Sequence, residues 1–123
     1  MPWTYVQATG KLSDPAGHWI ATGYSGHGEG VNNPADDAIP DIGPIPTGHY
    51  TIEPAITHPT CGPIAMRLDP VAGTDTHGRA GFLIHGDSAA GNHTASHGCI
   101  ILPPNIRTQI NASADRLLVV LAA

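Results

Sequence analysis

Short apolar runs separated by glycine and proline recur along the whole chain. Near the N-terminus, three short segments that mix apolar with polar residues, 3–8, 11–14 and 19–24, are separated by Gly10 and by Pro15-Ala16-Gly17. Segments of this length between turn residues are typical of β-strands. The first 24 residues therefore predict a meander of three short antiparallel strands.

The later segments continue this β-rich pattern. Pro103-Pro104 suits the first turn of a helix, where proline loses no hydrogen bond. Ile106 and Ile110, four residues apart, would face the core from that helix. We expect one mainly β domain over residues 1–123 with one short helix. Its further strands are predicted at residues 49–53, 64–68, 82–85, 99–102 and 116–121, and its longer loops at 25–46 and 86–95.

Composition narrows the class of protein. Five Lys and Arg against ten Asp and Glu give a net charge of −5, without a basic cluster, which argues against nucleic-acid binding. No apolar run approaches the roughly 18 residues of a membrane span. Residues 1–10 lack the charged and apolar regions of a signal peptide, so we expect a protein made in the cytoplasm without one.

The two cysteines occupy different surroundings. Cys61 lies between two prolines, which predicts a rigid turn, whereas Cys99 follows Gly98 and begins an apolar run. A disulfide between them is an alternative in an exported domain, but the difference in surroundings favours free thiols. Burial alone would be the simplest explanation for Cys99, because cysteine is often buried.

His85 and Cys99 together can supply a base and a nucleophile. His85 ends one predicted strand and Cys99 begins the next, so the two can face each other across the intervening loop. Gly98 would allow a tight turn whose amide groups point at a developing oxyanion. An imidazolium beside the thiol would lower its pKa from about 8.5. Spacing alone leaves the catalytic and the structural interpretation open.

Two ordered segments resemble the L,D-transpeptidase catalytic domain. His85-Gly86, followed by Ser96-His97-Gly98-Cys99, resembles the His…Ser/Thr-His-Gly-Cys motif of that family. Residues 43–50 resemble its Gly-Pro-x-Pro-x-Gly-x-Tyr/Phe segment. The resemblance implies a β-sandwich of short strands, with Cys99 as nucleophile and His85 as base. It also implies that His97 shapes the site and that the amides of residues 97–99 form an oxyanion hole.

The resemblance leaves the supporting residues open. Either the hydroxyl of Ser96 or the carbonyl of Gly86 could orient an imidazole. The family's cell-wall enzymes usually carry an arginine two residues after the cysteine, where this chain has Ile101. Arg79 or Arg67 could replace that arginine in holding a substrate carboxylate.

Two further residues are candidates for contact with the substrate. Gly86 adjoins the predicted base, and Tyr50 lies in the second motif segment. For Tyr50, packing in the core is an equally good explanation of an aromatic residue in a strand. Asp87 could pair with a histidine, although a role in stabilising its own loop is favoured.

The departure at Ile101, the short chain and the sequence Gly-Cys-Ile-Ile-Leu look more like the L,D-transpeptidase effectors of type VI secretion. This implies a toxin that acts in the periplasm of a target bacterium on peptidoglycan stem peptides, and a cognate immunity protein. Two alternatives stay open: a housekeeping wall-remodelling enzyme, and a catalytically silent peptidoglycan-binding module.

A zinc site is a further alternative. His85, His93, His97 and Cys99 are residue types that bind zinc. However, no CxxC or HxxxH pair is present. We therefore expect no metal and no cofactor.

Overall fold

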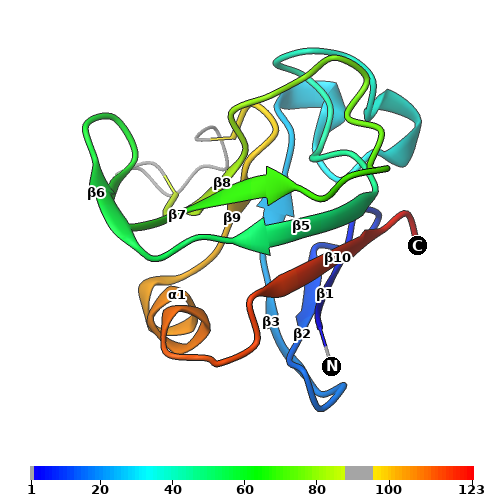
Figure 1. Cartoon of the computed structure of the whole chain (residues 1–123). Helices are drawn as coiled ribbons and strands as arrows, with labels where there is room; N and C mark the ends of the chain where they lie inside the picture. Colours follow the sequence, from blue (N-terminus) through cyan, green and yellow to red (C-terminus); the bar gives the residue numbers. More distant parts are fainter. Residues whose placement is uncertain (1, 88–95) are drawn as a thin grey trace.

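The computed structural model describes residues 2–87 and 96–123, and a single mixed sheet dominates it (Figure 1). One α-helix among these residues, α1 (Pro104–Asn111), lies between the last two strands, and two 3₁₀ turns, η1 (Gly28–Gly30) and η2 (Pro34–Asp36), lie before β5. The strands are β1 (Trp3–Val6), β2 (Lys11–Ser13), β3 (Trp19–Thr22), β4 (Tyr24–Ser25), β5 (Gly48–Ile52), β6 (Ile56–His58), β7 (Gly62–Pro70), β8 (Leu83–His85), β9 (Ile100–Ile101) and β10 (Leu117–Leu121).

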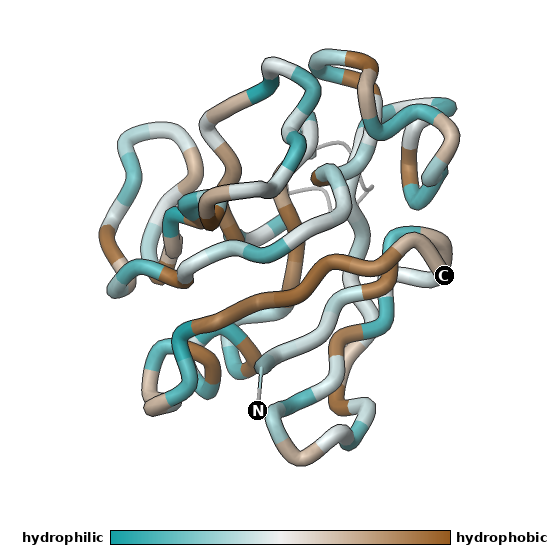
Figure 2. The backbone as a smooth tube through the Cα atoms, turned by 45° about the vertical axis from the view of Figure 1, so that its right-hand side comes forward, coloured by the Kyte–Doolittle hydropathy of each residue, from teal (hydrophilic) through white to brown (hydrophobic). Residues whose placement is uncertain are grey.

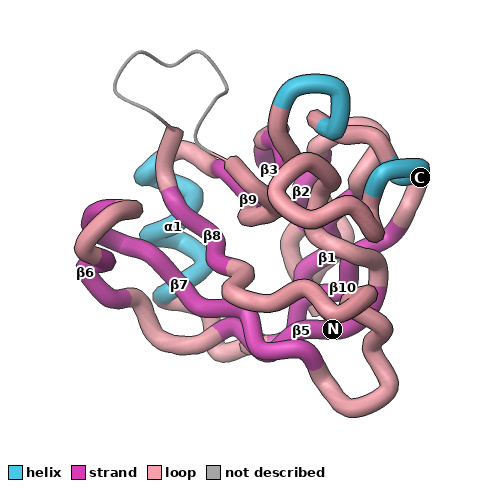
Figure 3. Tube along the Cα trace, turned by 90° about the horizontal axis from the view of Figure 1, so that it is seen from above, coloured by secondary structure: helices cyan, strands magenta, loops and turns pink. Residues whose placement is uncertain are grey.

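The order of the strands curls the sheet into a nearly closed barrel. The order is β3-β2-β1-β10-β5-β7-β8-β9-β4, with β6 attached to β7. The strands at its two ends, β3 and β4, are consecutive in the chain and separated only by Gly23. Seen from above, the strands surround the centre of the molecule (Figure 3). The expected sandwich is therefore wrong in its architecture, because one curved sheet replaces two packed ones.

Gly23 allows this closure. Its amide donates a hydrogen bond to the carbonyl of Gly10 at 2.8 Å. A Cβ atom at residue 23 would lie 2.0 Å from the carbonyl oxygen of Ile101 in β9. Only a residue without a side chain permits the backbone of β9 to approach this closely.

The interior of the barrel holds one apolar core. Leu118 and Val120 of β10 are buried, and this strand runs as a continuous apolar segment through the molecule (Figure 2). Ile106 and Ile110 are buried too, which confirms the predicted apolar face of α1. No helix among the described residues is long and apolar enough to cross a membrane.

The N-terminal meander is confirmed, since β2 pairs antiparallel with both β1 and β3. The predicted third strand, however, divides at Gly23 into β3 and β4. The pattern did not predict β6, a short strand between Pro54 and Pro59. Nor did it predict the parallel pairing of β1 with β10, which joins the two ends of the chain.

We predict that Gly23→Ala lowers the free energy of unfolding by about 3 kcal/mol, because the added methyl group would meet a backbone carbonyl that cannot move aside. The matched control is Gly17→Ala. Gly17 has a positive φ of 88°, but no atom lies within 4 Å of the position that a Cβ atom would take there. This substitution should cost about 1 kcal/mol through backbone conformation alone. Urea denaturation measures both, and equal losses would contradict the closure at Gly23.

Candidate active site

The parallel pairing of β8 and β9 brings the two motif residues to neighbouring strands. His85 lies opposite Ile101 in this pairing, so Cys99, two residues before Ile101, lies beside Leu83. The amide of Leu83 donates a hydrogen bond to Sγ of Cys99 at 3.3 Å. With ordinary strand spacings, the Cα atoms of Cys99 and His85 are separated by roughly 8 Å. Two residues that are fourteen positions apart in the sequence therefore lie on or beside neighbouring strands.

The thiol of Cys99 is held in its protonated form. Burial raises its pKa to about 11, although the amide of Leu83 and the nearby charge of Arg79 oppose this shift. The thiol donates to the carbonyl of Gly81, with 3.8 Å between sulfur and oxygen. Among the described residues, no hydrogen bond joins this thiol to the imidazole of His85.

The imidazole of His85 is buried and oriented by its neighbour. Its Nδ1 lies 2.8 Å from the carbonyl oxygen of Gly86. Because a carbonyl can only accept, Nδ1 carries the proton and Nε2 keeps its lone pair. Burial lowers the pKa of His85, so the ring is neutral at neutral pH. Gly86, one of the two groups considered for orienting the imidazole, makes this contact.

Ser96, the other group considered, instead organises the turn before the cysteine. Its buried hydroxyl donates to the carbonyl of Cys99 at 2.6 Å and accepts from the amides of Gly26 and Gly98. Gly98 has a φ of +127°, a conformation that favours glycine. Because Ser96 engages the amide of Gly98, that amide is not available to an oxyanion in this conformation.

Arg79 ties the two motif segments together. Its Nη1 donates to the carbonyls of Asp37 and Pro44, and its Nη2 donates to those of Gly43 and His97, at 2.7 to 3.4 Å. A Cβ atom at residue 98 would lie only 2.4 Å from Nη2. The guanidinium is buried, and it fixes the turn before Cys99 against residues 43 and 44.

His97 lies at the surface beside the nucleophile candidate. Its Nδ1 is 3.3 Å from the carbonyl oxygen of Asp41, and its ring stacks on that of His27, with 4.8 Å between centroids. His97 and Arg79 line a cavity of about 290 Å³ that includes Cys99. This cavity gives small molecules access to the thiol side of the site.

Two candidates for substrate contact, Tyr50 and Arg67, lie in different surroundings. Tyr50 has no exposed surface, its hydroxyl donates to the carbonyl of Pro46, and its ring packs edge-on against Phe82. It is a core residue, so the expected substrate contact of Tyr50 does not fit its position. Arg67 is exposed on β7. Asp87 accepts a hydrogen bond from the hydroxyl of Tyr24.

The zinc alternative gains no support from the described residues, where no three His, Cys, Asp or Glu side chains gather as a metal site requires. His93 lies outside the described residues, as does most of the predicted loop 86–95. Cys61 and Cys99 are both free thiols.

One charged residue near the site was not singled out from the sequence. Arg107 of α1 is 7% exposed, and its Nη2 lies against Gly86. An arginine next to the core residue Ile106 gives no signal in the apolar pattern, because that pattern expects a polar, solvent-facing residue there.

The thiol of Cys99 directly precedes β9, and the neutral imidazole of His85 ends β8, the strand that pairs in parallel with β9. The family model of the Tlde1 domain matches residues 20–120, which include both motif segments, and the chain therefore belongs to the Tlde1 family of type VI L,D-transpeptidase effectors. Membership implies delivery into target cells. No curated protein matches the chain.

We predict that Cys99 reacts slowly with iodoacetamide at neutral pH. Because its thiol titrates near 11, the rate should rise about tenfold per pH unit up to pH 9.5 without a plateau. The Cys61→Ser protein isolates the reaction of Cys99 in this measurement. A plateau below pH 8 would instead show a preformed thiolate–imidazolium pair.

A second prediction concerns the buried guanidinium. Arg79→Lys keeps the charge but cannot reach four carbonyls at once, so we expect it to lower the free energy of unfolding by about 2–4 kcal/mol. The exposed Arg67 provides the control, since Arg67→Lys should change that energy by less than about 0.5 kcal/mol. Chemical denaturation measures the free energy of unfolding of both variants. Equal values for Arg79→Lys and Arg67→Lys would contradict the role of Arg79.

Proposed function

We propose that this chain is a cysteine-dependent L,D-carboxypeptidase and L,D-transpeptidase that acts on the tetrapeptide stems of peptidoglycan, as an antibacterial effector. The observation that carries the proposal is the hydrogen bond between Nδ1 of His85 and the carbonyl of Gly86. This bond leaves Nε2 free to act as a base. His85 lies on β8, beside β9, the strand that begins directly after Cys99. Membership of the Tlde1 family supports the choice of reaction.

In the proposed reaction, Sγ of Cys99 attacks the carbonyl carbon between the third residue of the stem and the terminal D-Ala. The thiol proton passes to Nε2 of His85 as the carbon–sulfur bond forms. The tetrahedral intermediate then collapses, the carbon–nitrogen bond breaks, and His85 returns the proton to the amine of D-Ala. A thioester on Cys99 is left.

The protonation states of Cys99 and His85 favour these reaction steps over attack by a preformed thiolate. The raised pKa of Cys99 and the lowered pKa of His85 both stabilise the neutral pair in the free protein. Proton transfer therefore accompanies attack. The thiol must turn from Leu83 toward His85 when substrate binds, in keeping with the looser geometry of catalytic pairs in free enzymes.

Charge on the oxyanion is stabilised on the other side of the thiol. Because the amide of Gly98 already donates to Ser96, we assign the amide of Cys99 as the principal donor. The guanidinium of Arg79, held behind Gly98, adds a fixed positive charge at this position.

The thioester can then be resolved by three acceptors. Water gives a tripeptide stem, a free D-amino acid gives exchange, and a neighbouring stem amine gives a 3→3 cross-link. Trimming and exchange remove the tetrapeptide donors of the wall, which suits a toxin. A producing cell would need a cognate immunity protein against this activity.

Purified tetrapeptide muropeptides test the proposal directly. We expect Cys99→Ala and His85→Ala each to lower the release of D-Ala by at least about a thousandfold, because each removes a group that takes part in bond formation. Mass spectrometry of the products measures the loss. Normal turnover by Cys99→Ala would contradict the proposal.

Cys61→Ala is the matched control for the loss of a thiol. Cys61 lies at the β6–β7 turn and has no part in the proposed reaction, so its replacement should leave turnover within about threefold of wild type. A thiol-reactive carbapenem should modify Cys99 in both the wild-type and the Cys61→Ala protein. A catalytically silent binding module would not be expected to form that adduct.

A further inference from the structure

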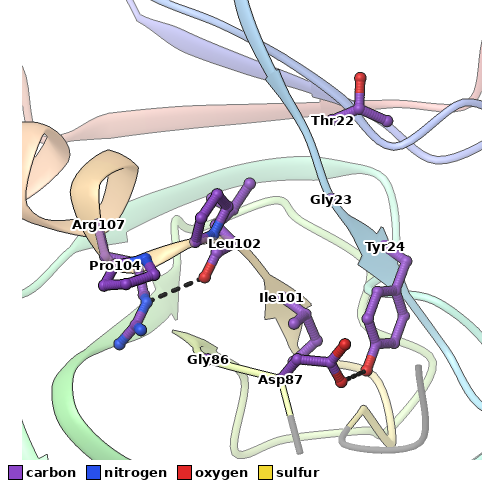
Figure 4. Close-up of a pocket in the computed structure, with 10 residues that line it drawn as sticks. Thr22, Gly23, Tyr24, Gly86, Asp87, Ile101, Leu102, Pro104 and Arg107 are labelled. Carbon is purple, nitrogen blue, oxygen red and sulfur yellow. Dashed lines mark hydrogen bonds between the residues drawn. The ribbon is translucent and has the colours of Figure 1, made fainter. Parts of the chain in front are cut away.

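A second cavity, of about 330 Å³, lies beside Gly86, the residue that follows the proposed base (Figure 4). Gly86 and Asp87 come to it from the end of β8, and Tyr24 comes from β4. Ile101 and Leu102 provide an apolar wall. The carbonyl of Gly86 also accepts the hydrogen bond from Nδ1 of His85, so the cavity adjoins a residue that contacts the imidazole of the proposed base.

Arg107 contributes the one cationic side chain among the described residues that line this cavity. It is 7% exposed, and its Nε donates to the carbonyl of Leu102 at 3.0 Å. Its Nη1 donates to the carbonyls of Pro63 and Ile64 at 2.8 and 3.2 Å. These contacts fix the guanidinium rigidly from one side.

The remaining nitrogen of Arg107, Nη2, has no hydrogen-bond acceptor among the described residues, and no carboxylate of that part of the chain lies within ion-pair distance of the guanidinium. Nη2 would lie 2.8 Å from a Cβ atom on Gly86, so glycine leaves it uncovered toward the cavity. Nη2 is therefore the part of this buried guanidinium that an anion in the cavity could pair with.

The position of this charge matches the departure noted in the sequence. Where the resembling enzymes carry an arginine two residues after the cysteine, this chain has Ile101, and Ile101 lines the same cavity as Arg107. Arg79, a candidate for replacing that arginine, donates to four backbone carbonyls instead. The charge thus reaches the cavity from α1 rather than from β9.

We propose, on the basis of the proposed function, that this cavity binds the terminal D-amino acid of the stem and that Nη2 of Arg107 pairs with its carboxylate. Ile101 and Leu102 then contact the small side chain of that residue. Its nitrogen, the leaving group, faces His85. Arg107 is accordingly a specificity-determining residue for a free C-terminal carboxylate.

The test compares two substrates with the wild-type protein: the tetrapeptide with its natural terminal carboxylate, and the same peptide with a terminal carboxamide. We expect kcat/KM to be on the order of 10- to 100-fold lower for the amide, because the charge-assisted pair with Arg107 is lost. Arg107→Gln should lower kcat/KM for the acid by a similar factor and leave the amide within about threefold of wild type.

Two further variants separate this role from a general effect on folding. Arg107→Lys keeps a charge and should retain part of the preference for the acid. Arg116 also donates to several backbone carbonyls but lies outside the cavity, so Arg116→Gln should retain the full preference. If Arg107→Gln does not fold, the role of Arg107 is judged from the ratio of kcat/KM for the acid to kcat/KM for the amide, measured for the wild type and for Arg107→Lys.

The outcomes distinguish this inference from the proposed function. Equal turnover of acid and amide by the wild type would overturn the role of Arg107 and leave the proposed function intact. A preference for the acid that persists unchanged in Arg107→Gln would also overturn it. Failure of the wild type to release the terminal residue from either peptide would overturn the proposed function itself.

Discussion

The candidate site depends on one buried guanidinium. Arg79 has no carboxylate partner among the described residues, and its charge is instead solvated by the carbonyls of the segment that precedes β5 and of the turn before Cys99. Since a buried charge must keep its polar partners, moving either segment would be costly. Ser25 reinforces the same junction, because its hydroxyl donates to the carbonyl of Gly98 and accepts from the amide of Ile45. Two segments far apart in sequence are thereby fixed around one thiol.

This junction fixes the backbone around a thiol that is protonated in the free protein. The backbone around Cys99 is positioned by Arg79 and Ser96, so in the proposed reaction the thiol moves while this backbone stays in place. His85 is held in the required tautomer by its own neighbour, Gly86. Burial disfavours both ions, so an inactive neutral pair is the stable state of the free protein. Such a state would protect an effector from oxidation or alkylation before it reaches its substrate.

The sequence predicted the local elements better than their assembly. Apolar runs between turn residues indicated the N-terminal meander and the apolar face of α1, because these depend on nearest neighbours along the chain. The curvature of the sheet was not predicted. It arises from Gly23, where a missing side chain lets β9 approach, and from the pairing of β1 with β10, which no periodicity encodes. A strand pattern alone cannot distinguish one curved sheet from two packed ones.

For the site, the ordered motifs located Cys99 and His85, and the structure brings them to neighbouring strands. What the motifs could not supply is the partner of each polar group. Ser96 and Gly86 were equally good candidates for orienting the imidazole. In the fold, Ser96 binds the turn before Cys99, and Gly86 contacts the imidazole of His85. Tyr50 matched a motif position yet lies in the core, since a motif residue can be retained for packing. Arg107 matched no motif, because its place in the cavity follows from the docking of α1.

The central claim is that Cys99 forms a thioester with the stem while D-Ala leaves. Peptide mass spectrometry of wild-type protein, quenched in acid during turnover of a tetrapeptide stem, tests it most directly. We predict that the peptide containing Cys99 gains the mass of the stem acyl group without its terminal D-Ala, and that the peptide containing Cys61 is unmodified. Release of D-Ala without this adduct at any time during turnover, or an adduct on Cys61 alone, would contradict it.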